Sequence, residues 1–134
     1  MSPPSETEAV LAANRAFYTA FRGRDVAAMD ALWAHRLPVC CIHPGWDALT
    51  VRNAVMASWR EILTGPGSPE IECQWEQVLL LGEVALVVCH EVIGRVVLAA
   101  TNAFAREDTA WRMVHHQASH LANPPPLRPR KVAL

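Results

Sequence analysis

Polar side chains interrupt the apolar segments of this chain at a few places, and some could support proton transfer. His43 closes a short apolar run just before Pro44-Gly45. Glu91, Asn102 and His116 each stand inside a longer apolar run. A histidine with an ordinary pKa of roughly 6.5 can act as a general acid or base near pH 7. An asparagine amide can donate a hydrogen bond to a carbonyl or enolate oxygen.

Each of these residues also has a purely structural interpretation. His43 could hydrogen-bond a loop, and Asn102 could bond a neighbouring strand. Glu91 and His116 could form a buried pair, which would raise the pKa of the histidine and lower that of the glutamate. Because buried polar groups are usually satisfied by one another, this pairing is favoured over catalysis for Glu91 and His116.

Other chemistries find no support in the sequence. In a strand, His116 and His120 would point the same way but stand roughly 13 Å apart, too far to share one metal ion. The chain has no Gly-rich phosphate loop, no G-x-S-x-G motif and no Cys/His spacing of a zinc site. We therefore expect no metal and no cofactor. The cysteines are expected to be buried, reduced thiols: Cys40, Cys41, Cys73 and Cys89.

Composition limits the class of protein. The chain has 134 residues, 51% of them apolar, which suits one globular domain. Twelve Lys and Arg stand against 13 Asp and Glu, so no basic excess is available to bind nucleic acid. No apolar run reaches the roughly 20 residues of a membrane helix, and the first residues lack a signal-peptide layout. We expect a cytoplasmic protein that binds neither nucleic acid nor membranes.

The spacing of apolar residues predicts which elements carry the polar side chains. Three helices and one short strand are expected before a loop at Gly65–Pro69. The helices should cover Glu6–Arg22, Val26–Trp33 after a cap at Asp25, and Val51–Leu63 after a cap at Thr50; the strand should cover Leu37–His43.

A meander of four long strands is expected after that loop. Gly82-Glu83 and Gly94-Arg95 fit two-residue turns, and Glu107–Thr109 fits a three-residue turn. The expected strands are Ile71–Leu81, Val84–Ile93, Val96–Arg106 and Ala110–Leu121. The plan is α+β, with a domain over residues 1–122. Residues 123–134 should form a Pro-rich extended tail whose Arg128, Arg130 and Lys131 are solvated.

The turns also predict the strand register. Gln77 should pair with Val88, Val88 with Thr101, and Thr101 with His115. Glu91, Asn102 and His116 then share one face, with His116 opposite Ala100. Cys73 and Met113 fall on the other face. Since that face is apolar as well, a second copy of the chain is the simplest cover for it, and we expect a homodimer through the sheet.

The chain resembles the nuclear-transport-factor-2-like, or SnoaL-like, superfamily from about Glu6 to Leu121. The resemblance rests on short motifs in the order and spacing of that superfamily. They are Phe17-Tyr18-x-x-Phe21 with Gly23-x-Asp25, Ile42-His43-Pro44-Gly45, Ala54-Val55 with Ser58-Trp59, Thr101-Asn102-x-Phe104, and the run from Trp111 to Ser119.

This resemblance implies a cone: three N-terminal helices packed on a strongly curved antiparallel sheet around an internal pocket. By similarity to ketosteroid isomerases, His43 would be the proton-shuttling base and Asn102 the oxyanion donor, with Glu91 and His116 as a tuning or second proton pair. Phe17 matches the phenolic donor of those isomerases, and Tyr18 is expected to face elsewhere. The side chains expected to line the pocket are Trp46, Phe17, Trp59, Phe104 and Cys89.

Members of this superfamily differ widely in function, so two functions remain open. The first is a cofactor-free isomerase, cyclase or dehydratase that transfers a proton next to a carbonyl group. The second is a non-catalytic ligand-binding or dimerisation and assembly module. In both cases the expected ligand is a small apolar or aromatic organic molecule. A paired, inaccessible Glu91 and His116 would favour the second function.

Overall fold

The computed structural model describes residues 5–67 and 70–129, and its helices follow the predicted spans closely. Helix α1 (Glu6–Arg22) begins where the Ser5 hydroxyl accepts the Glu8 N–H, and α2 (Val26–Leu32) begins where Asp25 accepts the Ala28 N–H. Helix α3 (Arg52–Thr64) has Val51 at its N-cap and no side-chain cap bond, so the cap predicted at Thr50 is wrong.

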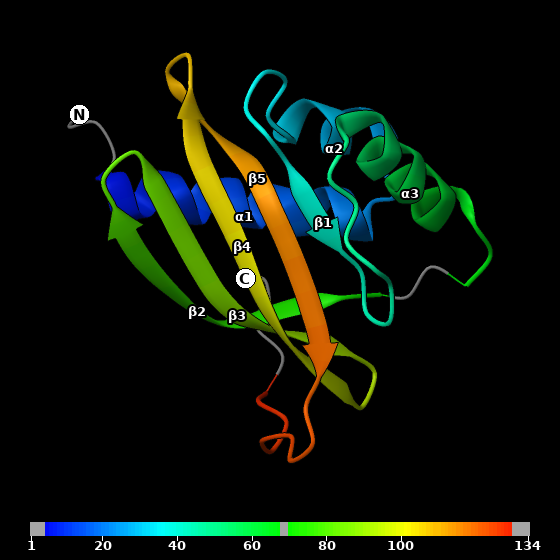
Figure 1. Cartoon of the computed structure of the whole chain (residues 1–134). Coiled ribbons are helices and arrows are strands. Elements are labelled where there is room, and N and C mark those ends of the chain that lie inside the picture. Colours follow the sequence, from blue (N-terminus) through cyan, green and yellow to red (C-terminus); the bar gives the residue numbers. More distant parts are fainter. Residues whose placement is uncertain (1–4, 68–69, 130–134) are drawn as a thin grey trace.

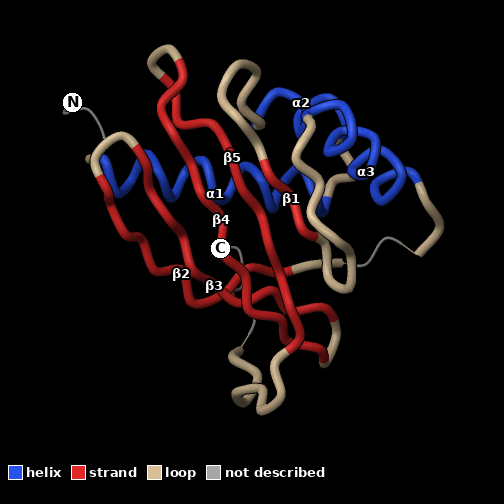
Figure 2. The backbone as a smooth tube through the Cα atoms, viewed as in Figure 1, coloured by secondary structure: helices blue, strands red, loops and turns tan. Residues whose placement is uncertain are grey.

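One five-stranded sheet holds the rest of the domain. Its order is β1-β5-β4-β3-β2, with β1 parallel to β5 and all other pairs antiparallel. The sheet curves around α1, which lies across one face, while α2 and α3 lie near the β1 edge (Figure 1, Figure 2). The predicted α+β class and curved sheet are confirmed. The strands are β1 (Cys40–Ile42), β2 (Glu72–Leu81), β3 (Val84–Ile93), β4 (Val96–Glu107) and β5 (Ala110–His120).

Both glycine turns have the predicted length, but the third turn does not. Glu107 pairs with Ala110, so the turn holds only Asp108 and Thr109, with Asp108 at φ 61°. A bulge between Ala103 and Phe104 then shifts the register once more. The two shifts together restore the predicted face of His116 but place it opposite Asn102 rather than Ala100. Between the shifts, Met113 pairs with Phe104 and is buried with it, so its predicted face is wrong.

A second bulge lies in β2, between Gln74 and Gln77. Trp75 takes a φ of 58° there, which a bulky residue rarely adopts. Because of this bulge Cys73 pairs with Glu91, which turns its side chain toward α1. The prediction that Cys73 faces outward is therefore wrong.

The C-terminal tail falls only partly within the described residues. Residues 123–129 adopt neither helix nor strand. Residues 130–134, including Arg130 and Lys131, lie outside the described residues, as do Ser68 and Pro69 of the predicted loop.

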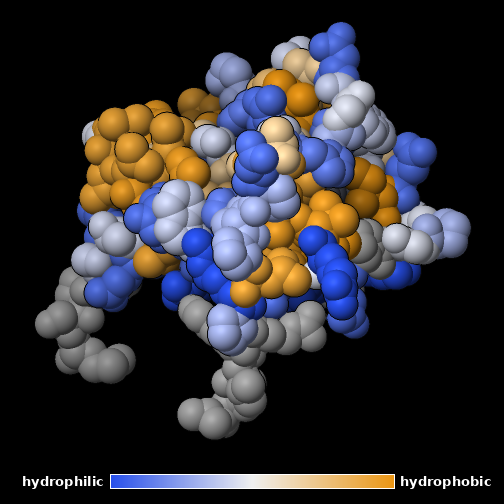
Figure 3. Space-filling model, turned by 90° about the horizontal axis from the view of Figure 1, so that it is seen from below, coloured by the Kyte–Doolittle hydropathy of each residue, from blue (hydrophilic) through white to orange (hydrophobic). Residues whose placement is uncertain are grey.

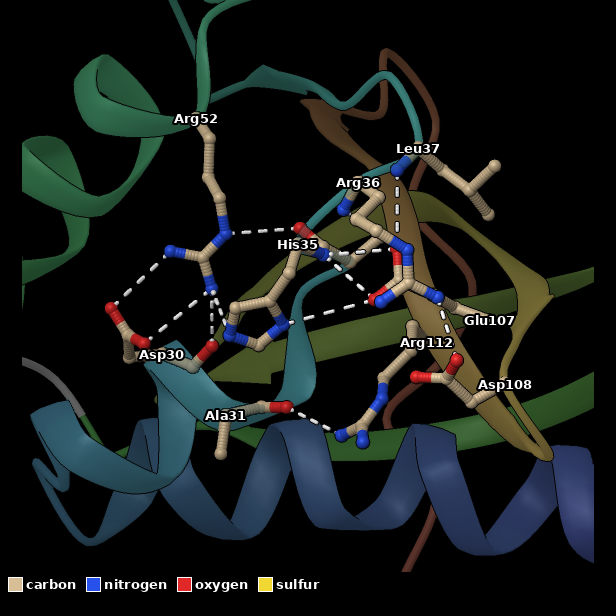
Figure 4. A network of polar contacts seen from close by, with 10 residues as sticks. Asp30, Ala31, His35, Arg36, Leu37, Arg52, Glu107, Asp108 and Arg112 are labelled. Atoms are coloured by element: carbon tan, nitrogen blue, oxygen red, sulfur yellow. Dashed lines mark hydrogen bonds and ion pairs between the residues drawn. The ribbon is translucent and has the colours of Figure 1, made fainter.

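A buried carboxylate fixes the segment that leads from α2 into β1 (Figure 4). Glu107, at the end of β4, accepts the backbone N–H groups of His35, Arg36 and Leu37 at 2.8–3.1 Å. These backbone donors lower the pKa of Glu107 to about 2. Arg52 of α3 holds the same segment from the other side through the Ala34 carbonyl. The position of β1, and hence of His43, depends on these contacts.

Replacing Glu107 tests this latch. Glu107→Gln removes the charge that the backbone donors stabilise, so unfolding should become easier by about 1–3 kcal/mol at pH 7. Because the pKa of Glu107 is depressed in the folded protein, its stabilising contribution is fully present above the ordinary value of 4.5 and disappears as the pH falls through about 2. The difference in stability between wild type and Glu107→Gln should therefore shrink over the same range. Urea unfolding at several pH values measures both effects.

The matched control is Asp108→Asn. Asp108 pairs with Arg36 on the surface, where both side chains are exposed, so this substitution should change stability little. Equal destabilisation by both substitutions would contradict the latch.

Candidate functional site

Asn102 is the centre of a buried polar network between α1 and the sheet. Its side-chain N–H₂ group donates to Asn14 Oδ1 at 2.8 Å and to the Tyr18 hydroxyl at 3.1 Å, both on α1. Its oxygen lies 2.6 Å from His116 Nδ1 on β5. Since that oxygen can only accept, His116 must carry its proton on Nδ1 and leave Nε2 as an acceptor.

A second branch of the network runs through Tyr18 to Glu91 on β3. The Tyr18 hydroxyl donates to Glu91 Oε2 at 2.6 Å and lies 3.3 Å from Cys89 Sγ. Burial raises the pKa of Glu91 to about 7, although the Tyr18 hydrogen bond acts in the opposite direction. Burial, reinforced by Glu91, raises the pKa of Tyr18 well above 10. The carboxyl group is thus the group in this network poised to titrate near neutral pH.

Glu91 and His116 are neighbours, but not as the charged pair that the sequence suggested. Glu91 Oε2 lies 3.9 Å from His116 Nε2, and both residues are 2% exposed. Burial lowers the pKa of His116 to about 3, with repulsion from His43 and His115 adding to the effect. The expected pKa directions are therefore both reversed, because desolvation outweighs attraction between the two groups.

His43 lies beside this network without a hydrogen bond to Asn102 among the described residues. Its Nε2 is 2.9 Å from Ser58 Oγ, and that hydroxyl donates to the Val55 carbonyl. The Ser58 oxygen must then accept, so His43 carries its proton on Nε2. Burial lowers the pKa of His43 to about 4. The imidazole is neutral at pH 7, and its N–H is used within the core.

The aromatic residues expected to line a pocket take different positions. Four of the five side chains expected to line the pocket are instead buried in the hydrophobic core: Phe17, Trp59, Phe104 and Cys89. Phe17 and Trp59 pack edge to face there. Trp46 is 43% exposed and packs edge to face on His43, so it covers this residue from outside.

A pocket of about 500 Å³ lies between α1 and the beginning of β2. Tyr18, Cys73 and Glu76 connect its wall to the buried network, since Glu76 accepts from Asn14 at 2.8 Å. Arg15 forms an ion pair with Glu76. The pocket therefore combines apolar surface with charge of both signs. Its lining is Arg15, Tyr18, Arg22, Glu70, Ile71, Glu72, Cys73 and Glu76.

Sequence reasoning missed Asn14 and Tyr18, and it assigned Tyr18 to the wrong side. Both are buried, as are Phe17 and Phe21, because the curved sheet covers a wide arc of α1. Asn14 and Tyr18 stand four residues apart, which places them on the same helix face. That spacing of two polar groups in an apolar helix face was the available signal.

The described residues contain no cluster of three or more His, Cys, Asp or Glu side chains placed to hold a metal ion. No helix among them is long and apolar enough to span a membrane.

Comparison with known proteins identifies the family. The family model described as a SnoaL-like domain matches residues 10–123. The chain belongs to the SnoaL-like domain family. The NTF2-like superfamily to which the sequence pointed is thereby confirmed.

Similar proteins carry diverse descriptions. This SnoaL-like domain superposes with a TM-score of 0.80 on a "putative dehydratase from the NTF2-like family" of Streptomyces avermitilis, at 28% identity over 91% of this chain and 100% of that one. A "putative calcium/calmodulin-dependent protein kinase type II association domain" of Thiobacillus denitrificans is 32% identical, with a TM-score of 0.75 over 90% and 99% of the two chains.

A longer plant protein also matches the domain. The F-box protein SKIP8 of Arabidopsis thaliana is 29% identical over 116 residues, which cover 84% of this chain. The match spans about half the length of SKIP8, 50%. The family is therefore shown, whereas the descriptions of its members do not agree on one activity.

Substituting Glu91 tests the electrostatics of the network. The pKa of Glu91 is raised from 4.5 to about 7 in the folded protein. As the pH rises through that window, wild-type protein should therefore lose up to about 1.4 kcal/mol of unfolding free energy from this group for each pH unit. Glu91→Gln keeps an acceptor for Tyr18 and should abolish this loss. The difference in unfolding free energy between the two proteins, measured from pH 4 to 8, isolates the contribution of Glu91.

Glu83→Gln, in the exposed turn between β2 and β3, is the control and should follow the wild-type curve. Parallel curves for wild type and Glu91→Gln would contradict the raised pKa.

Proposed function

We propose that this SnoaL-like domain is a non-catalytic module that dimerises through the outer face of its sheet and holds a small organic molecule in the pocket beside α1. The observation that carries the proposal is the closed state of the polar network. Asn102 donates both amide hydrogens to α1 and accepts from His116, and His43 donates to Ser58. An oxyanion donor must instead be aimed at the place where substrate charge develops.

The outer face of the sheet supports the dimer. Leu79, Leu81 and Val84 are 45%, 59% and 37% exposed there. Seen from below, apolar side chains gather on the side of the molecule where β2 ends and β3 begins (Figure 3). The other side of the sheet is covered by α1. Exposed apolar patches of this kind on a soluble domain mark interaction surfaces, and a second copy supplies a matching apolar surface by symmetry.

The similar structures support an assembly role as well. The protein from Thiobacillus denitrificans, at 32% identity, is described as an association domain. A domain whose outer sheet face is apolar and whose interior polar groups satisfy one another suits such a role better than a role in catalysis.

The pocket supports a ligand with both apolar and polar parts. Tyr18 and Ile71 contribute buried surface, whereas Arg22 contributes a cation near the Ile71 carbonyl. A small aromatic molecule with one polar substituent matches this lining.

Sedimentation tests the dimer. Wild-type protein at micromolar concentration should sediment at twice the chain mass of 14.8 kDa. The double variant Leu79→Lys, Leu81→Lys places two charges on the outer face and should sediment as a monomer. Val51→Lys, at an equally exposed apolar position at the start of α3, is the control and should remain a dimer. A wild-type protein that sediments only as a monomer would refute this assembly.

A melting-temperature screen tests the pocket. Wild-type protein is heated with a library of cyclic ketones, polyketides and aromatic acids, and a ligand at a hundredfold excess over its dissociation constant should raise the melting temperature by several degrees, or about 2.7 kcal/mol. Arg22→Ala should abolish the shift for ligands of the pocket. His43→Gln should retain it, because His43 does not line this pocket.

Each shift is measured against the melting temperature of the same variant without ligand. A hit that is lost in His43→Gln and kept in Arg22→Ala would place the ligand elsewhere.

One observation favours acid-base catalysis as a second candidate function. Tyr18 borders the pocket and donates to Glu91, whose pKa of about 7 suits a general acid or base. The protein from Streptomyces avermitilis with a TM-score of 0.80 is described as a "putative dehydratase". If a pocket ligand turns over, Glu91→Gln should stop turnover and leave binding unchanged; turnover that persists would exclude this role of Glu91.

A further inference from the structure

An aromatic shelf stands at the β2 bulge, away from the buried network. The Trp75 ring stacks on the His90 ring with centres 4.9 Å apart and planes 19° apart. Arg128 of the C-terminal segment completes the group. Its guanidinium carbon lies 6.0 Å from the centre of the Trp75 ring, and its Nη1 lies 3.0 Å from His90 Nδ1. Arg128 is thus in contact with the sheet, which the sequence did not predict.

The backbone conformation of Trp75 indicates that the surrounding structure holds this residue in place. Trp75 holds a φ of 58° and remains 47% exposed. A bulky side chain at positive φ is strained, and such strain persists where the surrounding structure requires it. Here the bulge turns the indole onto His90, so that an exposed aromatic surface faces Arg128.

The shelf borders a second pocket of about 300 Å³, and Arg128 and Pro129 form part of its wall. This pocket shares Arg15, Glu72, Cys73 and Glu76 with the pocket of about 500 Å³ described above. The two are therefore adjoining parts of one groove along the beginning of β2. The C-terminal segment bounds one end of that groove.

We propose that Trp75 and His90 form a binding shelf for a planar cation, and that Arg128 occupies the shelf and thereby closes one end of the groove. The second clause rests on the proposed function, since it concerns the ligand groove, whereas the shelf stands on its own contacts.

The chemistry of the shelf selects a guanidinium group. Its central carbon lies over the indole, and its Nη1 donates an N–H to the His90 nitrogen. This hydrogen bond requires a neutral imidazole, since a protonated His90 would have no lone pair on Nδ1. Burial and, after it, the charge of Arg128 lower the pKa of His90. A lysine ammonium could supply the charge but not the planar fork.

Histidine titration by NMR tests occupancy of the shelf. Arg128→Ala should raise the pKa of His90, because the nearby cation is removed, and Arg128→Lys should give an intermediate value. Arg95→Ala, in the exposed turn between β3 and β4, is the control and should leave the pKa of His90 at its wild-type value. An unchanged pKa in Arg128→Ala would overturn occupancy by Arg128.

Methylguanidinium then serves as the probe for the emptied shelf. It should shift the His90 resonance of Arg128→Ala saturably and leave wild type unshifted at the same concentration. The double variant Arg128→Ala, Trp75→Gly should lose this response; glycine accepts the positive φ, so the bulge can persist. Equal, non-saturating shifts in all three proteins would overturn the shelf. None of these measurements requires a groove ligand, so their outcome is independent of the proposed function.

Thiol labelling tests closure of the groove. Cys73 lines both pockets, so opening one end should make its reaction with a maleimide severalfold faster in Arg128→Ala than in wild type or Arg95→Ala. Peptide mapping by mass spectrometry separates Cys73 from the other cysteines. If NMR shows that the shelf is empty in Arg128→Ala and the labelling rate of Cys73 is nevertheless unchanged, the proposal that Arg128 closes the groove is refuted. The proposal that Trp75 and His90 bind a planar cation would then still stand.

Discussion

The hydrogen bonds of Asn102 connect the layers of this domain. One amide group joins α1, through Asn14 and Tyr18, to β5, through His116. All these groups are buried, so each would cost free energy if it lost its partner. The rotation of α1 over the sheet and the tautomer of His116 are therefore set together. Curvature of the sheet makes the arrangement possible, because it lets a wide arc of α1 be buried.

Most elements of the fold follow from local sequence. Apolar periodicity and the caps at Ser5 and Asp25 give α1 and α2, and Gly82 and Gly94 give two hairpins of the predicted length. Bulges were beyond the same reasoning, because an extra residue is stabilised by packing on both sides of a strand rather than by its own sequence. The tight turn at Asp108 and the bulge after Ala103 each shift the register by one residue. Together they preserve the face of His116 and change its partner.

The buried polar network could be predicted only in part, since Asn14 and Tyr18 of α1 were missed. Asn102, Glu91 and His116 lie together as the register indicated, but desolvation decides their protonation and keeps the imidazole neutral. His43 instead donates a hydrogen bond to Ser58 and packs edge to face on Trp59 in the aromatic core. The buried position of Tyr18 was not predicted, because helical periodicity assumes a flat partner surface that buries only one narrow face of α1. The interior polar groups satisfy one another, the outer sheet face is apolar, and the pocket touches the network only at its edge. These features support the proposed binding and assembly role.

The most direct test of this account is the protonation state of His116, measured by ¹⁵N NMR of the imidazole nitrogens from pH 5 to 8. A closed network predicts a neutral ring throughout this range, with the proton fixed on Nδ1 and Nε2 unprotonated. Titration of His116 near pH 6–7, or a proton on Nε2, would show that Asn102 does not accept from this ring. The network would then be open to another partner, and the non-catalytic account would fail.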